Sequence, residues 1–184
     1  HYNSLTLGNE LKPDSVLDLA LSQKYVAETG DDTMPQISLN EADEMLKFAG
    51  ENKIPVRGHV LVWHSQTPDW FFKENFDPNG AWVSKDKMTK RLENYIKTVM
   101  ETLAKDYPDV EFYAWDVVNE AASDAGTIRD AGSNNEVNGQ SAWVKVYGDQ
   151  SYIPLAFEFA KKYAPAGCKL FYNDYNEYSP NKQA

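Results

Sequence analysis

The segment FYAWDVVN, at residues 112–119, is an apolar run of strand length that is followed directly by Glu120. Two other segments resemble it: VRGHVLVW at residues 56–63, bounded by Pro55 and the SQTP loop, and KLFYN at residues 169–173. Short apolar runs rich in β-branched and aromatic residues are typical of strands in buried sheets. We therefore expect strands at these three places, with a further short strand at residues 2–7.

Helical patterns separate the expected strands. Residues 84–107 predict a long helix that begins after Ser84 and ends before Pro108. Shorter helices are expected at residues 15–27 and 40–52, the second with Ser38 or Asn40 as its cap and with Ser38 and Glu41 forming a capping box. Apolar side chains at helical spacing support the long helix and a last one, namely Met88, Leu92, Tyr95, Ile96, Val99 and Leu103 in the first and Ile153, Ala156, Phe157 and Ala160 in the second.

Alternating strands and helices predict an α/β fold with a parallel sheet. In such a sheet the functional side chains gather where the strands end, so the residues just after each strand are the candidates for a site. A polar stretch rich in Gly and Asn, at residues 125–141, reads as a long surface loop. The sequence contains no repeat and no interdomain linker, so its 184 residues fit one domain or a large piece of one.

Composition excludes several classes of partner. Eighteen basic and 28 acidic side chains give a net charge of −10, which argues against binding to nucleic acid or to anionic membranes. The mean hydropathy is −0.61, and no apolar run approaches the roughly 20 residues of a membrane-spanning helix. The single cysteine, Cys168, excludes an intrachain disulfide and is expected to be an inert core thiol.

The residues at the expected strand ends combine amides, carboxylates and aromatic rings. Flat rings stack on sugars, amides exchange hydrogen bonds with vicinal hydroxyl groups, and a carboxyl group can move a proton. Polyhydroxylated substrates require this chemistry. The residues concerned are Asn9, Glu10 and Lys12, then His59, Trp63, His64, Ser65 and Gln66, then Asp116, Asn119 and Glu120, and finally Asn173, Asp174, Tyr175 and Asn176.

Three motifs in this order resemble those of glycoside hydrolase family 10, the endo-β-1,4-xylanases. They are RGHVLVWHSQTPDW at residues 57–70, WDVVNEA at residues 115–121 and YNDYN at residues 172–176, and the opening NSLTLGNELKPD resembles the family's second-strand motif. The resemblance implies a (β/α)₈ TIM barrel, present here as an incomplete portion that lacks the first and the last strands. Residues 1–184 would then be a partial catalytic domain with the second to the sixth strands, one of them between residues 125 and 152.

The resemblance also implies roles for individual residues. Glu120 matches the general acid/base of a retaining mechanism, and Asn119 matches the residue that binds the 2-hydroxyl group of the sugar at the cleavage point. His59 matches a histidine that contacts the same sugar. The remaining matches are Trp63 and Gln66 in the neighbouring wall, Asn9 and Lys12 on the glycone side, and Tyr175 and Asn176 on the leaving-group side.

Two departures accompany the resemblance. Gly8 stands where the family usually has Glu, which is expected to weaken binding on the glycone side. The nucleophilic Glu belongs to the family's seventh strand, which we place outside this chain, so the 184 residues alone are expected to be inactive. No metal or cofactor is implied. The expected partners are xylan or xylo-oligosaccharides, with room for further domains of the same polypeptide, and the expected location is secreted, cell-surface or periplasmic.

Plainer interpretations stand beside these. Without the motifs, Glu120 reads as a solvated or capping carboxylate, Trp63 as a core side chain and Lys12 as an ordinary loop lysine. His64 is expected to be structural, and Asp116 and Asp174 are expected to be buried groups that orient their neighbours. For the whole chain, the alternatives are a non-catalytic carbohydrate-binding fragment and another retaining barrel glycosidase.

Overall fold

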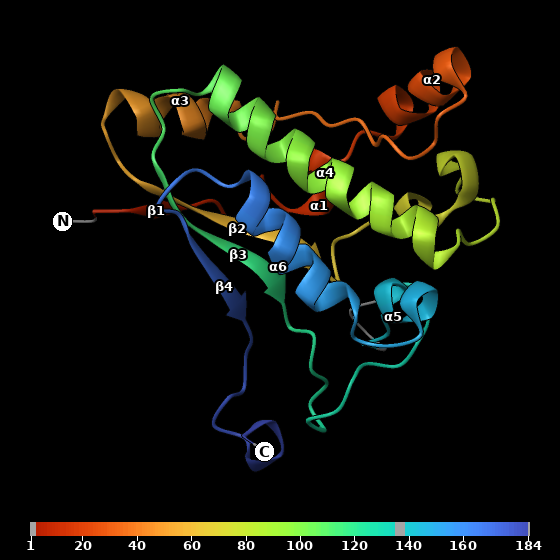
Figure 1. The fold of residues 1–184 in the computed structure, drawn as a ribbon. Coiled ribbons are helices and arrows are strands. Elements are labelled where there is room, and N and C mark those ends of the chain that lie inside the picture. Colours follow the sequence, from red (N-terminus) through yellow and green to blue (C-terminus); the bar gives the residue numbers. More distant parts are fainter. Residues whose placement is uncertain (1–2, 135–138, 184) are drawn as a thin grey trace.

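The computed structural model describes residues 3–134 and 139–183. It is an α/β structure in which strands and helices alternate along the chain (Figure 1). The strands are β1 (Leu5–Thr6), β2 (Val56–Trp63), β3 (Phe112–Asn119) and β4 (Lys169–Asn173). The helices are α1 (Pro13–Val16), α2 (Leu19–Thr29), α3 (Asp43–Glu51), α4 (Lys85–Asp106), α5 (Ala142–Tyr147) and α6 (Tyr152–Tyr163), with short 3₁₀ turns η1 (Asp69–Phe72), η2 (Glu74–Phe76) and η3 (Pro180–Lys182).

The four strands form one parallel sheet in the order β1-β2-β3-β4. Three strands coincide residue for residue with the expected ones, at 56–63, 112–119 and 169–173. The first is shorter than the expected 2–7, because only Leu5 and Thr6 pair with β2, while residue 2 lies outside the described residues. A parallel sheet with helices between its strands agrees with the expectation of an incomplete (β/α)₈ barrel.

The strand expected between residues 125 and 152 is absent from the described part of that segment, so this prediction was wrong. The chain there makes only single bridges, between Ala122 and Ile128 and between Ala131 and Ser141, before α5 begins. Its many Gly, Asn and Asp residues favour turns over an extended ladder. The described sheet therefore has four strands, where five were expected.

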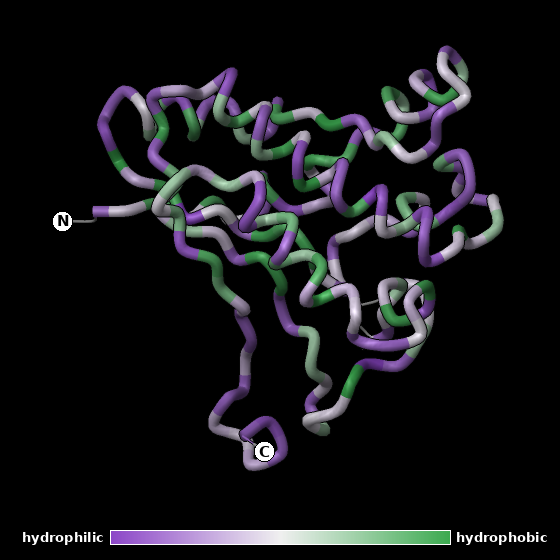
Figure 2. Tube along the Cα trace, viewed as in Figure 1, coloured by the Kyte–Doolittle hydropathy of each residue, from purple (hydrophilic) through white to green (hydrophobic). Residues whose placement is uncertain are grey.

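The long helix α4 follows its prediction closely. Ser84 is the N-cap, and its Oγ accepts a hydrogen bond from the backbone N–H of Lys87 at 3.3 Å. The six apolar side chains of the predicted stripe are all buried. In Figure 1, α4 and α6 lie side by side over one face of the sheet. Figure 2 shows that hydrophobic residues concentrate along the strands, whereas the chain after β4 is mainly hydrophilic.

The helix expected at residues 15–27 is two helices. Leu17 is extended, with ψ at 126°, and it bridges to Ile37, so α1 ends at Val16. Asp18 then starts α2, because its Oδ1 accepts a hydrogen bond from the N–H of Leu21 at 2.9 Å. A backbone pairing with a distant segment thus interrupts a locally helical pattern.

The helix expected at residues 40–52 begins later, at Asp43, and the predicted capping box does not form. Ala42 occupies the N-cap position, and no side chain caps this helix. Ser38 is held elsewhere: its N–H donates to the carbonyl of Val16, and its Oγ accepts from the N–H of Asn40. The same long-range pairing that divides the first helix therefore removes Ser38 from the second.

A buried cation ties α4 to the loops beside it. Arg91 is fully buried, and Nη2 donates to Oδ2 of Asp32 at 2.9 Å. Its other donors bind the backbone carbonyls of Asp32, Phe71 and Lys73 at 2.6–2.8 Å. Burial lowers the pKa of Arg91 to about 10 although Asp32 opposes the shift.

Within the described residues, no helix is both long and apolar enough to cross a membrane.

Gly58 provides a test of the packing behind β2. A Cβ atom at this position would lie 2.2 Å from the ring of Trp115, which is itself buried. We expect Gly58→Ala to lower the free energy of unfolding by about 1–3 kcal/mol, because the added methyl group would overlap the indole ring and force it to shift. Gly8→Ala is the control, since nothing lies within 4 Å of its added Cβ. Equal urea midpoints for the two variants would contradict this account.

Candidate active site

The candidate residues meet where the parallel strands end. Trp63 of β2 pairs in register with Asn119 of β3, and Asn119 pairs with Asn173 of β4. Because all three strands run in the same direction, these residues lie side by side at one edge of the sheet. Oδ1 of Asn119 accepts a hydrogen bond from Nδ2 of Asn173 at 2.6 Å, which fixes the orientation of the Asn119 amide.

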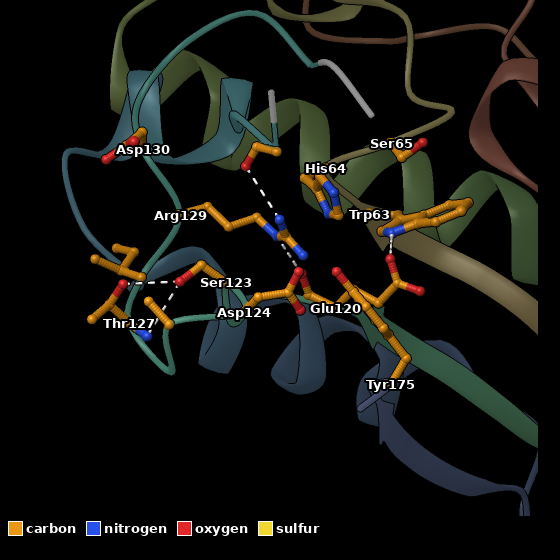
Figure 3. A pocket seen from close by; sticks show the side chains of 13 residues that line it. Trp63, His64, Ser65, Glu120, Ser123, Asp124, Thr127, Arg129, Asp130 and Tyr175 are labelled. Atoms are coloured by element: carbon orange, nitrogen blue, oxygen red, sulfur yellow. Dashed lines mark hydrogen bonds between the residues drawn. The ribbon is translucent and has the colours of Figure 1, made fainter. Parts of the chain in front are cut away.

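Glu120 is held by its backbone as well as by its side chain. Its N–H donates to the carbonyl of Asn173 at 2.8 Å, and its carbonyl accepts from Nε of Arg129 at 2.6 Å. The carboxylate accepts a hydrogen bond from the indole Nε1 of Trp63 at 2.8 Å, as Figure 3 shows. Trp63 is therefore neither a simple core residue nor a free surface ring, because it orients the candidate acid/base.

A second group forms around Lys12, which is 8% exposed. Its Nζ donates to Oδ1 of Asn9 at 2.8 Å and to Oε1 of Gln66 at 2.7 Å. The same ammonium lies 5.1 Å from the centre of the Trp63 ring. The four residues that the sequence assigns to the glycone side and its wall are thus in direct contact, and Lys12 is not an ordinary loop lysine.

His59 and Arg57 share one carboxylate. His59 Nδ1 lies 2.9 Å from Oδ2 of Asp116, and Nε of Arg57 donates to Oδ1 at 3.0 Å. The Nη2 of Arg57 contacts the same Oδ1. Burial alone would raise the pKa of Asp116, but the hydrogen bonds from His59 and Arg57 outweigh it and hold the pKa below 3.8. Asp116 is the buried, orienting carboxylate that the sequence predicts.

The lowered pKa of Asp116 predicts a loss of stability in acid. The folded protein binds this proton less tightly than the unfolded chain does, so the ionised carboxylate contributes its full stability above pH 3.8. That contribution is lost as the pH falls through the lower pKa of the folded state. We expect Asp116→Asn to have a flatter dependence of unfolding free energy on pH below 3.8 in urea titrations. Parallel curves for the variant and the unaltered protein would refute this.

His64 and His59 lie in different surroundings, since His59 pairs with Asp116 whereas His64 is buried. His64 is 6% exposed, and burial lowers its pKa to about 4. Within the described residues, its Nδ1 has no hydrogen-bond partner. His64 is therefore a neutral, buried ring at physiological pH, and its structural role stays a prediction. Among residues 3–134 and 139–183, no cluster of three or more His, Cys, Asp or Glu side chains could hold a metal ion.

A pocket of about 510 Å³ opens beside Glu120 (Figure 3). Tyr175 lines it, whereas the predicted neighbour Asn176 does not and instead lies 3.5 Å from Asp124 through its Nδ2. Lys182 positions Tyr175, because its Nζ lies 3.9 Å from the ring centre and donates to the Tyr175 carbonyl. The lining includes Trp63, His64, Ser65, Ser123, Asp124, Thr127, Arg129 and Asp130.

Asp174 is the second predicted orienting carboxylate. It accepts hydrogen bonds from Lys182 at 2.7 Å and from the hydroxyl group of Tyr172. Burial would raise its pKa, but these bonds lower the pKa below its ordinary value.

Cys168 is only half-buried and stands just before β4, so the expected core position is wrong. Burial nevertheless raises the pKa of its thiol to about 11.

Sequence reasoning missed Arg129 and Lys182. Arg129 is 5% exposed and supports the carbonyl of Glu120, and Lys182 organises the segment that carries Tyr175. A signal for Arg129 was present, since it is the one basic residue in the stretch 125–141. Nothing in the local sequence marks Lys182, because its partners Asp174 and Tyr175 lie several residues away.

Three candidate residues share an unfavourable backbone conformation. The φ angles of Gln66, Glu120 and Asn176 are 43°, 52° and 57°, in the left-handed region that L-residues seldom adopt. Such conformations cost about 1–3 kcal/mol each and collect at functional sites, where the surrounding structure enforces them. For Glu120 the enforcement is visible, since both of its backbone polar groups are hydrogen-bonded.

The parallel sheet, the convergent strand ends and the hydrogen-bonded carboxylate form the candidate site, and a comparison with known families identifies the class of domain that carries it. The family model described as glycosyl hydrolase family 10 matches residues 1–184. The chain belongs to glycosyl hydrolase family 10.

Curated relatives carry xylanase names. The bifunctional endo-1,4-beta-xylanase XylA of Ruminococcus flavefaciens is 50% identical over 183 residues, which are 99% of this chain and 18% of that protein. The endo-1,4-beta-xylanase Y of Acetivibrio thermocellus is 50% identical over 186 residues, which are 99% of this chain and 16% of that protein. The chain thus spans less than a fifth of the length of these relatives.

A solved structure matches the whole chain. It is the N-terminal endo-1,4-beta-D-xylanase 10B of Clostridium thermocellum, with CBM22-1 and GH10 modules, complexed with xylohexaose. The TM-score is 0.90 and the identity 48%, with all of this chain and 35% of that chain covered.

Proposed function

We propose that the polypeptide carrying this chain hydrolyses internal β-1,4-xylosidic bonds of xylan with retention of configuration. The observation that carries the proposal is the meeting of Glu120, Asn119 and the Lys12 group at one edge of a parallel sheet. Membership of glycosyl hydrolase family 10 and the xylanase names of its relatives support the choice of substrate.

Each group has a chemical task in this proposal. Glu120 protonates the leaving glycosidic oxygen and later activates water, and the indole N–H of Trp63 holds the carboxyl group in place for both steps. The Asn119 amide, fixed by Asn173, binds the 2-hydroxyl group of the sugar, an interaction that strengthens in the oxocarbenium-like transition state.

The flanking residues bind the polysaccharide on either side. Lys12, Asn9 and Gln66 present polar atoms to the glycone, and His59 contacts the sugar at the cleavage point. Tyr175 lines the pocket beside Glu120 and offers its ring to the leaving-group side. Asn176 is outside that pocket, and its assigned role on the same side stays a prediction.

A retaining mechanism also requires a nucleophilic carboxylate about 5–5.5 Å from the acid/base. We place this residue in a part of the polypeptide outside the 184 residues, in keeping with the 35% of the matched structure that the chain covers. Further domains and a location outside the cell stay predictions of the same proposal.

The test is a xylan assay on the full-length polypeptide that contains this chain. We expect reducing ends to appear from xylan and xylohexaose, and proton NMR to show the β-anomer of the product before mutarotation. Cellohexaose serves as the control for substrate class. Initial release of the α-anomer would overturn the retaining mechanism. Binding of xylohexaose without any hydrolysis would leave only the carbohydrate-binding alternative.

A further inference from the structure

Arg57 has no role in the proposed function, yet it controls the geometry of a residue that has one. Its guanidinium donates Nε and Nη2 to a single oxygen, Oδ1 of Asp116. The ring of Phe171, on β4, lies 4.7 Å from the guanidinium carbon and supports it from one side. The other carboxylate oxygen, Oδ2, is thereby left for Nδ1 of His59 at 2.9 Å.

This arrangement determines which nitrogen of His59 carries a proton. An ionised carboxylate only accepts hydrogen bonds, so Nδ1 of His59 must be the donor. In the neutral imidazole the lone pair is then on Nε2, the nitrogen directed away from Asp116. His59 would consequently accept a hydrogen bond from a sugar hydroxyl group.

We propose that Arg57 is a positioning residue: by occupying Oδ1 of Asp116 it commits Oδ2 to His59 and presents the Nε2 lone pair to the substrate. The proposal rests on the proposed function for its kinetic consequence. The tautomers of His59 expected in the variants below do not depend on any activity.

The substitution Asp116→Asn makes the role of Arg57 visible. The Arg57 side chain can only donate hydrogen bonds, so the oxygen of the introduced amide must face Arg57. The NH₂ group of the amide then faces His59. Nδ1 then has to accept, the proton moves to Nε2, and His59 can no longer accept a hydrogen bond from the sugar hydroxyl group. We expect kcat/KM on xylohexaose to fall about 10-fold or more.

Removal of Arg57 from that variant is expected to restore activity. In Asp116→Asn combined with Arg57→Met, the amide is free to turn its oxygen towards Nδ1, so kcat/KM should rise several-fold above that of Asp116→Asn alone. The matched control is Asp116→Asn combined with Arg57→Lys, where lysine is still only a donor and no recovery is expected. If Arg57 had a merely structural role, its replacement in the Asp116→Asn variant would lower kcat/KM further and would not restore it.

Nitrogen-15 NMR of labelled histidines in the full-length polypeptide provides a readout without substrate. We expect His59 to be protonated at Nδ1 in the unaltered protein, at Nε2 in Asp116→Asn, and at Nδ1 again in the double variant with Arg57→Met. An unchanged tautomer in Asp116→Asn, or equal kcat/KM for Asp116→Asn and both double variants, would overturn the proposal. Should Asp116→Asn fail to fold, an unchanged kcat/KM in Arg57→Met alone would overturn it, because Asp116 would then orient His59 without Arg57. An absence of xylan hydrolysis by the unaltered protein would instead refute the proposed function.

Discussion

Glu120→Gln is expected to reduce the hydrolysis of xylan by about 10²–10⁴-fold in the full-length polypeptide, while xylohexaose still binds. Glutamine retains the shape of the side chain and an oxygen that can accept from Nε1 of Trp63, which lies 2.8 Å from the carboxylate. It cannot donate an acidic proton to the leaving oxygen. The expected change is therefore in kcat, and initial rates with isothermal titration of xylohexaose will separate it from any change in affinity.

A substrate whose leaving group needs no protonation gives a more specific test of the acid role of Glu120. A dinitrophenyl xylobioside releases a phenolate that needs no proton, so the first step on this substrate should be far less affected by Glu120→Gln than the first step on xylan. Glu101→Gln is the matched control, because that side chain is 62% exposed on the outer side of α4. Equal losses on both substrates would mean that Glu120 is not the acid.

The second large effect concerns stability. We expect Arg91→Met to lower the free energy of unfolding by about 3–5 kcal/mol, because the change leaves the Asp32 carboxylate without its buried cation. Three backbone carbonyls, those of Asp32, Phe71 and Lys73, lose a donor as well. Urea unfolding at pH 7, followed by tryptophan fluorescence, measures the change.

A control separates the effect of burial from the loss of a positive charge beside Asp32. Lys87 also contacts Asp32, at 3.1 Å, but its side chain is 29% exposed. Lys87→Met should therefore cost much less than Arg91→Met, since water can replace the ammonium. Equal costs would show that burial of Arg91 does not set the size of the effect.

The predictable part of the fold is the part set by local pattern. Strands β2, β3 and β4 were predicted residue for residue, because each is a short apolar run between polar segments. Helix α4 was predicted with its cap, since Ser84 and the apolar stripe act within one element. The common location of the candidate residues was also predictable, because parallel strands bring their carboxyl ends to one edge of the sheet.

The unpredicted features depend on contacts between distant residues. The pairing of Leu17 with Ile37 divides one expected helix and removes Ser38 from its capping box. From the sequence alone, Arg91 would be placed on the surface of its helix. Its burial depends on Asp32, almost 60 residues earlier in the chain. Arg129 supports Glu120 from a loop whose composition predicts only turns. No window of neighbouring residues contains this information.

The left-handed backbone at Gln66, Glu120 and Asn176 bears on attempts to make the protein more heat-resistant. A common engineering strategy replaces residues in that conformation by Gly or Asn, which tolerate it at lower energetic cost. Here the first two positions carry the side chains that contact Lys12 and Trp63. Thermal tolerance gained at these positions would remove the groups proposed to act on substrate, so engineering should be directed to the exposed Lys53 instead.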